Sequence, residues 1–315
     1  MTPLLELLAD GVFHRGPELA EQLGISRAGI NQQIQSIRGQ GIVVESVRAR
    51  GYRMPGGAEW LRDQTIRRAL RRTFPGIAVD VLASTDSTNR FLMGFDWASA
   101  PRQHAVYAEH QSAGRGRRGR AWVSPWGHNL YMSCAQTFHD GLPDGLSLRV
   151  GVSLAKMLAG QGVRGIQVKW PNDLWVADHK CGGILVEVQG DPAGCCRAVI
   201  GVGLNVQTPV SVAGQIDQPW TDLRTVGLKP GVTRNQLASR AARAIFQSFE
   251  MSQWQDGFAK YDALANRDVR VFGPTSDGDS IGRAVGIDEE GALRVIIGDQ
   301  ERSIRSGEIS VRTHA

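Results

Sequence analysis

Gly114-Arg-Gly-Arg-Arg-Gly-Arg120 places four arginines among three glycines in the middle of the chain. Glycine leaves the backbone free to turn. A loop of this kind can fold its backbone amides and guanidinium groups around a polyanion such as a triphosphate. It is not a Walker A loop, because the chain contains no GxxxxGK[ST] motif. Taken alone, the stretch also fits a second interpretation, an arginine-rich loop that binds nucleic acid.

Two tryptophans follow the arginines. Trp122 and Trp126 are close enough in sequence that we expect both to form apolar walls beside the guanidinium groups. A hydrophobic wall next to a cationic wall suits a ligand that combines an amphipathic carboxylic acid with a phosphate. The glycines at the ends of the loop predict a segment that becomes ordered when a ligand binds.

A second basic and acidic element lies downstream, Lys169-Trp-Pro-Asn-Asp173. Proline ends the preceding apolar strand, so Asn172 and Asp173 are presented at the strand end. Asp173 can hold Mg²⁺ or orient an incoming amine, and the alternative is a turn aspartate. Lys180 precedes the apolar strand Gly182–Glu187. There its positive charge can stabilise both a substrate carboxylate and the phosphate that this carboxylate attacks. A surface lysine is the alternative.

A hydroxyl and amide cluster, Ser84-Thr-Asp-Ser-Thr-Asn89, ends the first strand of the central region. Such a cluster can satisfy a polar, neutral ring such as a ureido group, although a helix cap is the commoner role. The histidines form no metal cluster, and no GxSxG motif is present, so nucleophilic hydrolysis has little support.

Residues 1–56 have the pattern of a winged helix-turn-helix. Ser26 caps a third helix with Ile30, Ile34 and Ile37 on one stripe. A basic hairpin tip, Arg48-Ala-Arg50, follows as the wing. The alternative is a three-helix domain with a solvated face, but the acid-free third helix and the basic wing together favour DNA binding. The expected DNA contacts are Ser26, Arg27, Asn31, Gln32, Arg48 and Arg50.

The remaining chain divides into two parts. Residues 60–265 mix strand-like runs with helical stretches, which predicts an α/β (α+β) domain around one sheet. It opens with a helix that carries arginines from Arg62 to Arg72, which we interpret as a solvated face, with contact to DNA or another domain as the alternative. Residues 266–315 contain only short strands separated by turns, which predicts a small β-barrel.

Composition sets the broad class. The chain has 315 residues, a net charge of +5, and ordinary apolar and charged contents of 42% and 21%. Its four cysteines have neither disulfide nor zinc spacing, so we expect free thiols in a reducing cytoplasm. No signal peptide and no apolar run of about 20 residues is seen, and we expect no membrane partner.

These motifs together resemble the biotin protein ligases. The resemblance rests on Ser87-Thr-Asn89, Gln111 with the arginine loop, the stretches 169–173 and 180–187, and Gly201-Val-Gly-Leu-Asn205. The N-terminal module and Gly307-Glu-Ile-Ser310 are similar to the bifunctional bacterial form that represses the biotin operon. The resemblance implies a central domain akin to class II aminoacyl-tRNA synthetases and a C-terminal SH3-like barrel.

The resemblance also implies an activity. Biotin and MgATP would give biotinyl-5′-AMP, which then modifies a lysine of a biotin carboxyl carrier protein; the adenylate-bound homodimer would bind operator DNA. The implied biotin contacts are Ser87, Thr88, Asn89, Gln111, Arg115, Gly116, Arg117 and Lys180. The implied ATP contacts are Arg117, Asn172, Lys180, Asn205, Trp220 and Arg312. The implied catalytic residues are Arg115, Arg117, Asp173 and Lys180, with Asp173 also a candidate Mg²⁺ ligand.

Three alternatives remain open at this stage. One is a ligand-sensing transcription factor without catalysis, which the winged helix alone would suit. Another is a ligase whose N-terminal module does not regulate. A lipoate ligase is the neighbour within the enzyme class, and the arginine loop and the winged helix make it the less favoured one.

Overall fold

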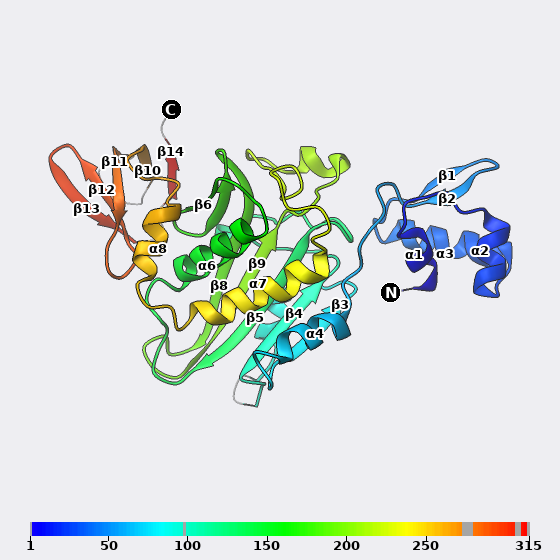
Figure 1. Ribbon diagram of the computed structural model, residues 1–315, viewed down its shortest axis with the longest axis horizontal. Coiled ribbons are helices and arrows are strands. Elements are labelled where there is room, and N and C mark those ends of the chain that lie inside the picture. Colours follow the sequence, from blue (N-terminus) through cyan, green and yellow to red (C-terminus); the bar gives the residue numbers. More distant parts are fainter. Residues whose placement is uncertain (1, 97–98, 273–279, 306–309, 314–315) are drawn as a thin grey trace.

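A computed structural model describes residues 2–96, 99–272, 280–305 and 310–313. Three sheets follow one another along the chain: a two-stranded hairpin, a seven-stranded central sheet and a five-stranded C-terminal sheet. In Figure 1 the N-terminal module and the C-terminal sheet lie at opposite ends of the molecule, with the central sheet between them. The predicted mixed α/β class is confirmed.

The N-terminal module has the predicted winged helix-turn-helix architecture. Its elements are α1 (Pro3–Leu8), α2 (Gly16–Leu23), α3 (Arg27–Gly39), β1 (Glu45–Val47) and β2 (Gly51–Arg53). Ser26 caps α3 by accepting from the amide of Gly29 at 3.0 Å. The apolar stripe of α3 is buried against α1 and α2, and its other face is left to solvent.

The central sheet has the strand order β3-β4-β5-β9-β8-β7-β6. Only β3 and β4 run parallel, and all the other neighbours are antiparallel. The strands are β3 (Ala78–Leu82), β4 (Gln103–Ala108), β5 (Leu130–Phe138), β6 (Ile166–Lys169), β7 (Asp173–Val176), β8 (His179–Gly190) and β9 (Cys196–Leu204).

Helices cover both faces of this sheet because its strands alternate buried side chains between two cores. The larger core lies under α4 (Asp63–Arg71), α6 (Leu146–Gly160) and α7 (Arg234–Ser248), which cross the front of the sheet in Figure 1. On the opposite face, α5 (Thr88–Met93) packs Leu92 against Val106 and Val199. The loops carry two short 3₁₀ helices, at Arg117–Gly119 and Val210–Gln215.

Two predictions about the strands were wrong. The sequence pattern gave no strand between Pro171 and Lys180, but β7 occupies Asp173–Val176 and pairs with both β6 and β8. Lys180 was expected just before a strand, and it lies inside β8, which begins at His179. Asp173 and Lys180 therefore stand on neighbouring antiparallel strands.

The C-terminal part is the predicted all-β unit, preceded by α8 (Trp254–Tyr261). Its antiparallel strands run in the order β13-β12-β11-β10-β14. They are β10 (Asp268–Phe272), β11 (Ser280–Ile287), β12 (Leu293–Ile297), β13 (Gln300–Ile304) and β14 (Ser310–Thr313). Of the stretch Gly307-Glu-Ile-Ser310, residues 307–309 lie outside the described residues, and Ser310 begins β14.

Candidate functional site

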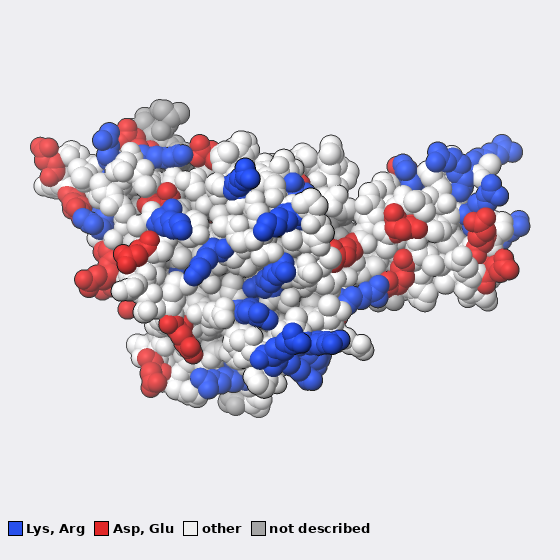
Figure 2. All heavy atoms as spheres, in the orientation of Figure 1, with Lys and Arg blue, Asp and Glu red and all other residues white. Residues whose placement is uncertain are grey.

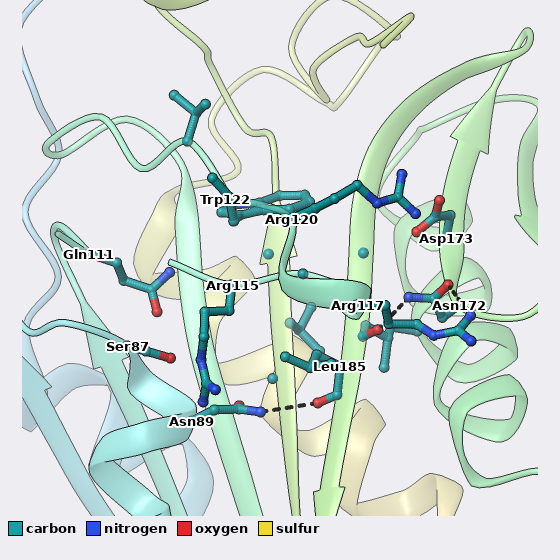
Figure 3. Close-up of a pocket in the computed structure, with 18 of the residues that line it drawn as sticks. Ser87, Asn89, Gln111, Arg115, Arg117, Arg120, Trp122, Asn172, Asp173 and Leu185 are labelled. Carbon is teal, nitrogen blue, oxygen red and sulfur yellow. Dashed lines mark hydrogen bonds between the residues drawn. The ribbon is translucent and has the colours of Figure 1, made fainter. Parts of the chain in front are cut away.

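A pocket of about 360 Å³ opens where the arginine loop crosses the central sheet. Its walls come from the loop, the start of α5 and strands β7, β8 and β9. Figure 3 shows Ser87, Asn89 and Gln111 on one side of this pocket and Asn172 and Asp173 on the other. The motifs that the sequence placed far apart thus share one cavity.

The neutral polar side of the pocket is held by a hydrogen-bond chain. The amide oxygen of Gln111 accepts from the backbone N–H of Thr88 at 2.9 Å and from its hydroxyl at 3.1 Å. The buried Ser133 hydroxyl lies 2.7 Å from the Thr88 hydroxyl and 2.6 Å from Oδ1 of Asn89. These groups are oriented before any ligand arrives, which suits the recognition of a small neutral ring.

Ser133 was not among the predicted site residues. It lies in an apolar run of β5, and nothing in that run pointed to it. Its contacts join residues more than forty positions apart, so only the sheet topology reveals them.

Glu187 is a second residue that the sequence did not single out. Its carboxylate accepts from Nδ2 of Asn89 at 2.7 Å and pairs with the guanidinium of Arg115 at 3.2 Å. It stands at the end of the stretch 180–187 that carried the resemblance, which was the available signal. One carboxylate therefore links the first loop arginine to the neutral side of the pocket.

The cationic side contains Arg117, Arg120 and Lys180. The Nη1 of Arg117 lies 3.4 Å from Oδ1 of Asn172, an interaction drawn in Figure 3. Burial, followed by repulsion from Arg118, lowers the pKa of Arg117. Arginine nonetheless stays charged in proteins, so the loop presents partly desolvated positive charge, which strengthens its attraction for an anion.

Lys180 forms an ion pair with Asp173 across β7 and β8, with 2.9 Å between Nζ and Oδ1. Its ammonium also lies 5.4 Å from the centre of the Trp122 ring. Lys180 and Asp173 have side chains that are only 12% and 20% exposed, so each charge needs a partner.

Glycines make room for the pocket floor. A Cβ at Gly201 would collide with the amide of Asn89, and one at Gly203 would collide with the Trp122 ring. Gly183 similarly faces Trp122 and the Lys180 side chain. The glycines of the stretches 180–187 and 201–205 therefore let side chains from other segments lie directly on the sheet.

Trp220 and Asn205 lie next to the main pocket. Together with Lys180 and Trp122 they line a smaller cavity of about 40 Å³. The backbone of Lys180 pairs with that of Trp220, which places the half-buried indole beside the lysine. The Asn205 amide donates to the Thr221 carbonyl at 3.1 Å, so it anchors the segment that carries Trp220.

Trp126 and Arg312 were both expected at the site, and neither side chain is found there among the described residues. Trp126 does not form a wall beside the arginines: it is buried in the core of the N-terminal module, stacks on His110 and donates to the Gln40 carbonyl at 2.9 Å. Arg312 lies in β14, where its backbone pairs with Arg270, and its side chain lies outside what the structure describes.

The expected DNA-contacting residues lie on the exposed face of α3 and at the wing. Arg27, Gln32, Arg48 and Arg50 are exposed, and the Arg50 guanidinium stacks 4.2 Å from the Phe13 ring centre. The Ser26 hydroxyl is engaged in capping α3, and Asn31 accepts a hydrogen bond from the Tyr52 hydroxyl. Within the described part of the chain, the side chains of Arg27 and Gln32 on this face are not used in hydrogen bonds of the fold.

Neither a metal cluster nor a membrane span was found in the described part of the chain. It holds no group of three or more His, Cys, Asp or Glu side chains placed to bind a metal ion. No helix within it has the length and apolar character needed to cross a bilayer.

Comparison with known proteins identifies three matching families along the chain. Residues 81–205 match the biotin/lipoate A/B protein ligase family, residues 3–53 an HTH domain, and residues 267–312 the biotin protein ligase C-terminal domain. The chain is 37% identical to the bifunctional ligase/repressor BirA of Escherichia coli, over 98% of this chain and 96% of that protein. The BirA of Bacillus subtilis is 30% identical, over 98% of this chain and 97% of that one.

A solved structure supports the same relationship. The biotin protein ligase of Aquifex aeolicus in complex with biotin and ATP superposes with a TM-score of 0.64 at 25% identity. That match covers 75% of this chain and 99% of the other.

Proposed function

The chain belongs to the biotin protein ligase family, and on this premise we propose that it is a bifunctional ligase and repressor. As a ligase it joins biotin to ATP, giving biotinyl-5′-AMP and pyrophosphate, and then passes the biotinyl group to a lysine of a biotin carboxyl carrier protein with release of AMP. As a repressor it binds operator DNA of biotin genes. The relatives that match almost end to end are named as bifunctional ligase/repressor proteins.

One observation carries the ligase proposal: cations from two separate stretches line a pocket whose other side is neutral and polar. Arg117 and Arg120 come from the loop, and Lys180 comes from β8. Joining a carboxylate to a triphosphate brings several negative charges together. Positive groups fixed in advance around that point lower the barrier, since they need no reorganisation during the reaction.

We assign the neutral side to the biotin head. Ser87, Thr88, Asn89 and Gln111 offer hydroxyl and amide groups that can donate to a ureido oxygen and accept from its N–H groups. The biotin chain then runs across Trp122 towards Lys180 and brings its carboxylate to the cations. Gly116, Asn172 and Trp220 complete the phosphate and adenine contacts in this assignment.

Lys180 and Asp173 take successive roles in this proposal. Before substrates bind, each neutralises the other. When the biotin carboxylate and the α-phosphate arrive, Lys180 turns to bridge them, and Asp173 is released to orient the amine of the acceptor lysine. Asp173 is the residue that would hold Mg²⁺, which would supply positive charge to the phosphates during adenylation.

The test is to incubate the protein with biotin and ATP labelled at the α-phosphate, and to look for protein-bound acyl-AMP. Lipoic and octanoic acids serve as competing substrates. Labelled biotinyl-AMP that disappears when a carrier domain is added supports the proposal. A labelled adduct with lipoate in place of biotin would assign the chain to the lipoate side of its family.

The winged helix supplies the repressor half. Its exposed α3 face and basic wing fit a major groove and the adjacent backbone. We infer that the adenylate-bound chain forms a homodimer, so that two winged helices reach two half-sites together. Sequence-specific DNA binding that strengthens on adding biotin and ATP supports this half, and labelling without such binding would leave a ligase only.

A further inference from the structure

Helix α4 ends in a cluster of arginines. Ile66 and Leu70 are buried, whereas Arg67, Arg68 and Arg71 lie in the C-terminal half of the helix and Arg72 is its C-cap. Residues 64–79 contain these four arginines and no carboxylate, so this one segment carries +4 of charge in a chain whose total is +5. Figure 2 shows the basic side chains crowded over this edge of the central domain.

Only one of the four arginines, Arg67, has an ion pair among the described residues. Arg67 donates to the Val79 carbonyl at 2.6 Å and pairs with Asp63. Arg68, Arg71 and Arg72 are exposed, and none has a carboxylate partner among the described residues. Arg68 and Arg72 stand one helical turn apart, so their like charges lie on the same side of the helix.

The winged helix by itself is a weakly charged DNA-binding module. Residues 1–56 hold six arginines, no lysine and five carboxylates, a net charge of only +1. Two of the six are occupied within the module, because Arg38 binds the Val44 carbonyl and Arg53 pairs with Glu45. Since neutralised phosphates supply most of the affinity for a duplex, this module leaves much of that attraction to be supplied from elsewhere in the chain.

The linker between the two parts is fixed at several points, so α4 has a defined place beside the winged helix. Glu59 accepts from the amides of Arg234 and Asn235 at the start of α7, at 2.6 and 3.2 Å. The Trp60 indole donates to the Leu5 carbonyl at 3.2 Å, and Arg62 pairs with Glu6 of α1. The ten residues from the wing to Asp63 span at most about 35 Å, so the start of α4 lies within that distance of the wing.

We propose that Arg68, Arg71 and Arg72 of α4 form a second DNA-contacting surface, which binds the phosphate backbone of a duplex outside the part read by the winged helix. The proposal rests on DNA binding by the winged helix and adds a sequence-independent contact from the central domain. Arginine suits this role because its guanidinium matches phosphate geometry. The surface adds affinity and salt dependence without adding base specificity.

The test uses the full-length protein and a random-sequence duplex of about 40 base pairs, with binding measured between about 50 and 200 mM KCl. The variant R68Q/R71Q/R72Q keeps residues that favour helix. Losing three phosphate contacts should lower the slope of log K against log[salt] by about 2.7 and weaken binding about tenfold or more at the low-salt end. The matched control, K260Q/R283Q/R302Q, removes the same charge at the C-terminal end of the molecule and should leave the slope unchanged.

An unchanged slope in the α4 variant, or equal losses in the α4 variant and the control, overturns the proposal. Slower labelling of the carrier protein with unchanged DNA binding also overturns it, because the surface would then serve an acidic protein. The variant R27A/R48A separates this proposal from the repressor role: if it binds the duplex normally while the α4 variant does not, the winged-helix assignment fails and the α4 surface stands.

Discussion

Lys180 and Asp173 face each other across two antiparallel strands, with 2.9 Å between ammonium and carboxylate, inside the pocket that the arginine loop covers. The Trp175–Lys180 pairing follows a register shift between Leu174 and Trp175, so the bulge sets which residue stands near Asp173. A largely buried pair of this kind satisfies both charges while the pocket is empty. It also means that one group cannot act on a substrate without releasing the other.

The substitution Asp173→Asn separates the two half-reactions. Lys180 keeps its charge, so the rate of adenylate formation should stay within about threefold of the wild-type rate. Transfer to the carrier lysine should slow by about 10²-fold, which is the smaller end of the rate losses seen when a general base is removed. Single-turnover assays of each half-reaction measure the two rates. Equal slowing of both would show that the carboxylate serves Lys180 or the metal instead of the amine.

Two substitutions of Glu187 should weaken biotin binding to different degrees. Glu187→Gln keeps an acceptor for Asn89 but loses the ion pair with Arg115, and Glu187→Ala loses both. A hydrogen bond to a charged group contributes about 1.5–3 kcal/mol, so the KM for biotin should rise about tenfold in the Gln variant and further in the Ala variant. The exposed Glu18→Gln on α2 is the control. Equal KM values across the series would remove Glu187 from the site.

Gly201 lies at the pocket floor, and Gly160 on α6 is a control position for the same substitution. A methyl group at Gly201 meets the Asn89 amide, whereas at Gly160, the last residue of α6, it meets nothing within 4 Å. Gly201→Ala should therefore weaken biotin binding about tenfold and destabilise the fold by about 1–3 kcal/mol. Gly160→Ala should be neutral or stabilising. Biotin titration calorimetry and thermal unfolding measure both effects, and normal biotin affinity in Gly201→Ala would contradict the assigned floor.

Long periodic elements could be predicted from the sequence, and short polar ones could not. Helix α3 was expected after its cap at Ser26 and runs from Arg27 to Gly39, because its apolar stripe is continuous. Strand β7 was missed because it has four residues and begins with a carboxylate directly after a Pro-Asn pair. Its pairing with β6 and β8 overrides that weak local preference.

The motif residues of the site could be named from the sequence, but their partners could not. Ser133 and Glu187 contact Asn89 across 44 and 98 positions of the chain, and no local pattern encodes such a contact. Trp126 was placed wrongly for the same reason. It follows Trp122 closely in sequence, yet it turns away from the pocket to stack on His110 beneath the winged helix.

Trp126 links the N-terminal module to the central domain, so a substitution there should loosen the junction. Its indole N–H donates to the carbonyl of Gln40 at the end of α3, while its ring stacks on His110 at 4.8 Å. Trp126→Phe removes the hydrogen bond and retains an aromatic ring, at a cost of about 1 kcal/mol. Hydrogen exchange should become faster around residues 37–42 and stay unchanged in the central sheet. Unchanged exchange near Gln40 would mean that this contact does not hold the junction.

His128 gives a pH dependence with a definite sign. Burial, followed by repulsion from Arg234, lowers the pKa of His128 to about 4. Its neutral form is therefore favoured by the fold, and this contribution is complete above the unfolded pKa of about 6.5 and is lost as the pH falls towards 4. The loss amounts to about 3 kcal/mol at most. Burial raises the pKa of Asp262 to about 6, which acts in the opposite direction between pH 4 and 6.

The two opposing groups are separated by comparing the wild type with His128→Gln. Asp262 is common to both proteins, so the difference between their unfolding free energies isolates the histidine. Denaturant unfolding at about pH 7 and about pH 4.5 should show the wild type losing about 2 kcal/mol or more relative to the variant on acidification, since about two pKa units lie within that range. Parallel curves for the two proteins would place the His128 pKa near its ordinary value and contradict its burial beside Arg234.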